Sequence, residues 1–231
     1  MHLRIIGLFL AFVSFALAQT PPPVIKTRLL PVSIGGNVEN LFFKTGEKVL
    51  PFEAYQLGFG PPLDYAGPRR FILHSSETAF SARPPGPAPV ASVDLPPGAD
   101  KVLLLCIPNQ EGKLRLVTYD ISGKQAQAGD YRIFNLSPGA VSVILGDKTF
   151  VVEPAQDKTL SDPDWRTEVR DINFQLATVT NGEANKVYSS MWGHQPGRRN
   201  FIFLINGRTA TMPIEILRFY DVPSADLPVG N

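Results

Sequence analysis

Short runs of strand-type residues follow one another along almost the whole chain, and this pattern is the strongest constraint on its fold. The runs are either apolar or alternate between apolar and polar residues, and Gly, Pro, Asn or Asp separates them. Within 113–121, for example, Leu114 and Leu116 alternate with charged residues. The three- and four-residue spacing of an amphipathic helix is nearly absent. We therefore expect an all-β protein, an antiparallel β-sandwich with few or no helices.

The segments that fit a strand are 28–34, 39–43, 52–57, 69–74, 90–95, 101–107, 113–121, 131–136, 141–145, 148–153, 169–179, 186–192, 200–205 and 214–220. Pairs of turn residues follow several of them. Gly146-Asp147 separates two β-branched runs, as a tight hairpin turn requires, and Asn181-Gly182 and Asn206-Gly207 give the same signal. We expect a turn at each of these pairs.

The first 18 residues have the features of a signal peptide. Arg4 precedes the apolar run 5–15, and Ala16-Leu17-Ala18 has the small-x-small pattern that a signal peptidase recognises. The run is shorter than the roughly 20 residues that span a bilayer, although a membrane anchor remains the alternative. We expect cleavage before Gln19, no membrane span afterwards, and a protein that is periplasmic, on the cell surface or secreted.

Proline-rich segments suggest how the rest of the chain is divided. A proline run at 21–23 favours an extended leader over 19–27, and 28–222 is expected to form a single sandwich domain, followed by a tail at 223–231. The stretch 155–167 is polar and rich in turn residues. The alternative to a single domain is therefore a division near this stretch into two small domains.

Charge and motif content exclude several functions. Removing residues 1–18 removes Arg4 and no acid, so the mature chain has no formal net charge and nucleic acid is not an expected partner. His74 and His194 are the histidines left, too few for a multi-histidine metal site, and no nucleotide-binding glycine motif occurs.

Cys106 lies in an apolar run and is expected to be a buried small hydrophobe rather than a nucleophile.

One loop combines side chains that could bind a ligand. Trp192, His194, Arg198 and Arg199 could offer an aromatic platform and forked guanidinium contacts to a sugar ring or an anion. The alternative is that the tryptophan belongs to the core and the arginines shield a sheet edge.

The acids between 157 and 171 have two possible uses besides solvation of a linker. Asp157, Asp162 and Asp164 could hold a structural calcium ion, the one cofactor that we expect to be possible. Asp162, Asp164 and Glu168 could instead supply the carboxylate pair of a hydrolase that acts on glycans or another envelope polymer.

Two neighbouring segments carry a resemblance to a known class of proteins. Ala128-Gly129-Asp130-Tyr131 enters the run 131–138, and the hairpin 141–152 follows. These segments resemble exported bacterial immunoglobulin-like domains. The resemblance implies an extracytoplasmic immunoglobulin-like sandwich and transfers no catalytic residue. The sequence thus predicts an exported, non-catalytic module that binds a protein or glycan partner in the cell envelope, with the carboxylate-dependent hydrolase as the alternative.

Overall fold

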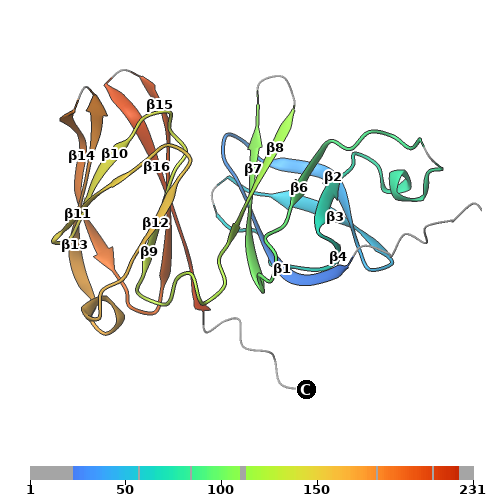
Figure 1. The fold of residues 1–231 in the computed structure, drawn as a ribbon, viewed down its shortest axis with the longest axis horizontal. Coiled ribbons are helices and arrows are strands. Elements are labelled where there is room, and N and C mark those ends of the chain that lie inside the picture. Colours follow the sequence, from blue (N-terminus) through green and yellow to red (C-terminus); the bar gives the residue numbers. More distant parts are fainter. Residues whose placement is uncertain are drawn as a thin grey trace, which may run out of the picture.

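The computed structural model describes residues 23–56, 58–83, 85–109, 113–180, 182–209 and 211–223. The predicted signal peptide, the first residues of the predicted leader and the tail after Pro223 lie outside the described residues. Figure 1 shows two groups of strands side by side, one coloured blue to green and the other yellow to red. We call them the N-terminal lobe, residues 24–120, and the C-terminal lobe, residues 131–221.

The N-terminal lobe contains one four-stranded sheet in the order β4-β1-β7-β8 and two two-stranded sheets, β2-β3 and β5-β6. Its elements are β1 (Val24–Ser33), β2 (Val38–Thr45), β3 (Lys48–Ala54), β4 (Leu63–Pro68), β5 (Arg70–Leu73), the 3₁₀ helix η1 (Glu77–Ser81), β6 (Ala91–Asp94), β7 (Lys101–Pro108) and β8 (Leu114–Asp120).

The C-terminal lobe contains two four-stranded sheets, β11-β10-β13-β14 and β12-β9-β15-β16. Its elements are β9 (Tyr131–Asn135), β10 (Val141–Leu145), β11 (Lys148–Val152), β12 (Asp157–Leu160), the 3₁₀ helix η2 (Asp164–Arg166), β13 (Arg170–Thr180), β14 (Glu183–His194), β15 (Arg199–Thr209) and β16 (Met212–Asp221).

The expected all-β, sandwich-like fold is confirmed, and the immunoglobulin-like topology stays a prediction. Each predicted strand overlaps an observed one, and most pairings are antiparallel. The exceptions are β1 with β7 and β9 with β15, which pair in parallel. β4 and β12 were missed. The buried positions of β4 hold Tyr65 and Gly67, with prolines on either side, and β12 is polar, so neither shows an apolar alternation.

Two of the three predicted turns are confirmed. Gly146 and Gly182 have φ angles of 63° and 82°, and each lies between two paired strands. The turn predicted at Asn206-Gly207 is wrong, because β15 continues to Thr209 through a register shift. A side chain at Gly207 would collide with the backbone of Met212, so this glycine permits a close approach of two strands instead of a reversal.

Each lobe has its own apolar core, and a third apolar cluster joins the lobes. In β7 both faces are buried: Leu104 and Cys106 belong to the core of the N-terminal lobe, whereas Leu103 and Leu105 belong to the third cluster. The expectation for Cys106 is confirmed, since its side chain is fully buried and burial raises its pKa to about 12. The third cluster is completed from the C-terminal lobe by Phe134, Phe201, Phe203 and Phe219.

The boundaries of these parts differ from two expectations. β1 begins at Val24, so residues 24–27 of the predicted leader pair with β4 instead of forming an extended leader. The polar stretch 155–167 contains β12 and η2 and lies inside the C-terminal lobe, whereas the lobes are joined through 121–130. No helix among the described residues is long and apolar enough to cross a membrane.

Candidate ligand site between the two lobes

The structure places Trp192 in the core of the C-terminal lobe. Its side chain is 9% exposed, and its ring stacks on Phe174 with 3.8 Å between the centroids. The Arg218 guanidinium lies 4.7 Å from the Trp192 ring, and the indole N–H donates to the Tyr188 hydroxyl at 3.2 Å. The indole is therefore engaged by neighbouring side chains.

His194 is fully buried and bonded on both ring nitrogens. Nε2 lies 2.5 Å from the carbonyl oxygen of Trp165, which can only accept, so Nε2 carries the proton. Nδ1 then accepts from the Tyr131 hydroxyl at 2.9 Å. Burial lowers the pKa of His194, although the bond to Trp165 opposes this effect.

This lowered pKa predicts an acid-sensitive fold. Below the unfolded pKa of about 6.5, the unfolded chain takes up a proton at His194 that the folded chain resists, so the free energy of unfolding falls as the pH falls from 7 to 5. Urea unfolding at each pH measures this slope. A His194→Gln variant should show a flatter slope than the wild-type protein. An equal slope in wild type and His194→Gln would contradict this assignment.

The two adjacent arginines have different surroundings. The guanidinium of Arg198 lies 4.0 Å from the Tyr220 ring centroid. Arg199 is 2% exposed, and its Nη1 donates to the carbonyl oxygens of Ile121 and Ala126. Three of the four residues predicted to form the ligand platform are thus buried and bonded to other parts of the protein: Trp192, His194 and Arg199. No side-chain contact among the described residues joins them to Arg198, so the common ligand platform stays a prediction.

Two of the three predicted calcium ligands are held in separate ion pairs. Asp157 pairs with Arg132 at 2.6 Å and Asp162 with Lys148 at 3.0 Å, while Asp164 begins η2. The Lys148 hydrogen bond lowers the pKa of Asp162. Among the described residues no group of three or more His, Cys, Asp or Glu side chains is placed to hold a metal ion. The calcium site stays a prediction.

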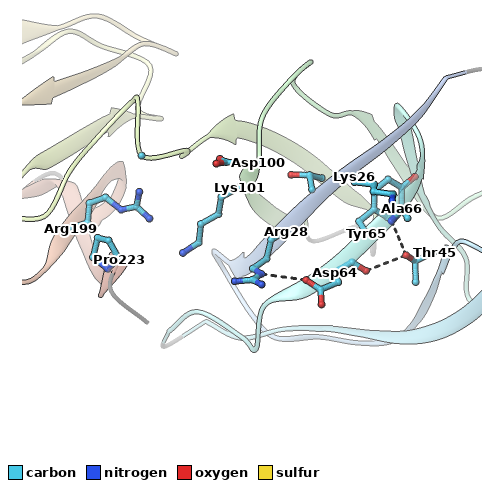
Figure 2. A pocket seen from close by; sticks show the side chains of 12 residues that line it. Lys26, Arg28, Thr45, Asp64, Tyr65, Ala66, Asp100, Lys101, Arg199 and Pro223 are labelled. Carbon is cyan, nitrogen blue, oxygen red and sulfur yellow. Dashed lines mark hydrogen bonds and ion pairs between the residues drawn. The ribbon is translucent and has the colours of Figure 1, made fainter. Parts of the chain in front are cut away.

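A pocket of about 630 Å³ lies between the lobes. Figure 2 shows Arg28 and Lys101 approaching it from the N-terminal lobe and Arg199 from the C-terminal lobe. Its volume lies in the range of small-molecule sites in proteins. The wall comes from β1, β4, β7 and β15, together with the residues around Thr45, Gly123 and Pro223.

One largely buried carboxylate, bonded to the pocket-lining residues Lys101 and Arg199, joins the two lobes. Asp221 accepts from Nε and Nη2 of Arg199 and, at 2.9 Å, from Nζ of Lys101. Burial by itself would raise the pKa of Asp221, but the hydrogen bonds and charges of Arg199 and Lys101 outweigh it and hold this pKa below its usual value. Asp221 is therefore charged at neutral pH, and its contacts with Arg199 and Lys101 fix this wall.

The mouth of the pocket is more exposed. Nε of Arg28 donates to Asp64 at 3.3 Å, and the Asp64 side chain is 89% exposed. The Thr45 hydroxyl donates to the Asp64 carbonyl and accepts from the backbone N–H of Ala66, which ties β2 to β4 at this wall (Figure 2).

Sequence reasoning missed this pocket, with the exception of Arg199, which it assigned to a different site. The signal that could have indicated it is the pair Lys26 and Arg28, which lie two residues apart on one strand and therefore on one face. Searches with the whole chain found no matching family model and no matching curated protein.

Proposed function

We propose that the protein is an exported, non-catalytic β-sandwich module of the periplasm or cell envelope, and that it binds a protein or glycan partner there. The signal sequence at 1–18 supports the export, and the all-β architecture supports a module whose surfaces and pockets carry its function. The immunoglobulin-like resemblance of 128–152 is in keeping with an extracytoplasmic location.

The pocket between the lobes is the observation that best supports a binding function. It combines a volume of about 630 Å³ with charged side chains from both lobes. The Arg199–Asp221–Lys101 cluster holds part of its wall in place by ion pairs and hydrogen bonds. A ligand would therefore meet groups that are already positioned, which reduces the entropy lost on binding.

The hydrolase alternative lacks a comparable observation. The Asp162 carboxylate forms an ion pair with Lys148 at 3.0 Å, and the Glu168 carboxylate lies 3.8 Å from the exposed Arg170 guanidinium. The Lys148 hydrogen bond lowers the pKa of Asp162, which is the opposite of what a glycosidase proton donor needs.

Export is tested by expressing the full chain in a bacterial host and measuring the intact mass of the product in each cell fraction. We expect a product that begins at Gln19, outside the cytoplasm. The variant Ala18→Phe, which places a bulky residue at the cleavage position, should accumulate as the uncleaved precursor, whereas Ala11→Phe in the apolar run should be processed normally. An uncleaved wild-type chain in the cytoplasm would contradict the proposal.

A further inference from the structure

We propose that the groove between β14 and β16 binds an extended, acidic segment of a partner protein, which lies along the free edge of β16 with a carboxylate beside Arg198 and Arg218. This surface belongs to the C-terminal lobe and is separate from the pocket between the lobes. The inference rests on the proposed binding function and names the class of partner.

β14 and β16 are edge strands of the two sheets of the C-terminal lobe. Within the described residues β14 pairs with β13 alone and β16 with β15 alone, so one side of each strand has no strand partner. β16 holds no proline after Pro213, so alternate backbone N–H and carbonyl groups of its remaining residues face this open side. Such an edge can accept an extended peptide as an additional strand.

A groove of about 350 Å³ lies between these two edges. Its lining is mostly apolar: Tyr188 and Trp192 come from β14, and Met212, Ile214 and Ile216 from β16. The three residues of β16 are two positions apart, so their side chains leave the same face of the strand. A peptide along β16 would place every second side chain in this groove, which favours a segment with apolar residues at alternate positions.

The tryptophan of the groove does not offer a stacking surface to a sugar ring. Phe174 stacks on the Trp192 ring at 3.8 Å, and the Arg218 guanidinium lies over the same ring at 4.7 Å. Because these two groups cannot occupy one face, both faces of the indole are covered. The indole therefore presents only an apolar edge, which suits an aliphatic side chain better than a sugar.

Two guanidinium groups at one end of the groove have no carboxylate within ion-pair distance among the described residues. Arg218 donates to the side-chain oxygen of Asn200 and to the carbonyl oxygen of Gly193, and Arg198 lies over the Tyr220 ring. Tyr220 is two residues beyond Arg218 on β16, so these side chains share a face. Burial lowers the pKa of Arg218, and the positive charge of Arg198 adds to this effect. A carboxylate of the bound segment would pair with both cations and relieve their repulsion.

One acid also lines the groove. Glu215 lies three residues before Arg218 on β16, so its side chain leaves the opposite face of the strand. The two cations therefore determine the sign of the charge at their end of the groove.

The probes are fluorescent, amidated octapeptides with Val or Ile at every second position, Thr between them, and Asp at the first or the last position. Peptides with Asn in place of Asp are the uncharged counterparts. Fluorescence anisotropy at constant ionic strength measures their dissociation constants with the purified protein. We expect saturable binding of at least one acidic peptide and about tenfold weaker binding of its Asn counterpart, because a charged hydrogen bond is lost. Arg198→Gln should weaken the acidic peptide by a similar factor and leave its Asn counterpart unchanged.

Two control variants locate the site. Met212 and Met191 lie on the two edge strands and are 62% and 60% exposed, but of these two only Met212 lines the groove. Met212→Gln should weaken both kinds of peptide about threefold, because an apolar contact is lost, whereas Met191→Gln should bind them as the wild-type protein does. Arg115 lies on β8, an edge strand of the N-terminal lobe, and Arg115→Gln is the matched control for Arg198→Gln.

Three results would overturn the inference: no saturable binding of an acidic peptide, equal binding of this peptide by Arg198→Gln and wild type, or equal binding by Met212→Gln and wild type. Melting temperatures without peptide show that each variant is folded. These results leave export and the pocket between the lobes untouched. A cytoplasmic, uncleaved chain would instead overturn the proposed function.

Discussion

Replacing Arg199 with methionine should lower the free energy of unfolding by about 3 kcal/mol, as measured by urea denaturation at pH 7. Arg199 donates to Asp221 through two nitrogens and to the carbonyl oxygens of Ile121 and Ala126. The substitution leaves these buried acceptors without their donor. We expect the lower end of the range for broken buried ion pairs because Lys101 still pairs with Asp221.

The neighbouring Arg198 provides the control for Arg199. It lies against the half-exposed ring of Tyr220, so Arg198→Met removes one cation–π contact and should cost no more than about 1 kcal/mol. Equal effects of the two substitutions would show that Arg199 does not anchor Asp221 and the segment that joins the lobes as the structure indicates.

Truncating Phe134 to alanine should cost about 3–5 kcal/mol and should weaken the coupling between the lobes. Phe134 is fully buried in the third cluster, 4.8 Å from the Phe203 ring and 4.5 Å from the Tyr119 ring of the other lobe. The cavity therefore opens where the lobes meet. Scanning calorimetry should resolve two unfolding transitions in Phe134→Ala where the wild-type protein shows one.

Phe174→Ala is the matched variant for this experiment. Phe174 is also fully buried, but it belongs to the core of the C-terminal lobe alone. Its truncation should cost a similar free energy and leave a single transition, because the lobe interface stays intact. Two transitions in Phe174→Ala, or a cost below about 1 kcal/mol in Phe134→Ala, would contradict the assigned role of the third cluster.

Strand alternation made most of the fold predictable, and its absence explains the failures. Segments such as 141–145 carry apolar residues at every second position, which is the signature of a strand with one buried face. β12 lacks this pattern because its sequence is polar, and it is held by pairing with β9. Gly207 was predicted to lie in a turn. It lies in β15 instead, where the absence of a side chain allows β15 and β16 to pack closely.

The pocket could not be predicted because it depends on how the lobes meet. Lys101 is the first residue of an apolar strand, where a solvent-facing lysine would be expected. Its ammonium group instead donates to Asp221, which is 120 residues away in the sequence. Arg199 was expected to bind a ligand or to shield a sheet edge, whereas its side chain is buried and bonded to Asp221, Ile121 and Ala126. Neither feature follows from local patterns, since both arise from tertiary contacts.

The central claim is that the protein binds an envelope ligand without chemically altering it. The most direct measurement incubates the purified protein with soluble envelope glycan fragments and follows the small molecules by NMR. We predict that at least one fragment binds and that every fragment remains intact after prolonged incubation. Cleavage of a fragment by the wild-type protein that disappears in Asp162→Asn would contradict the account and establish the hydrolase instead.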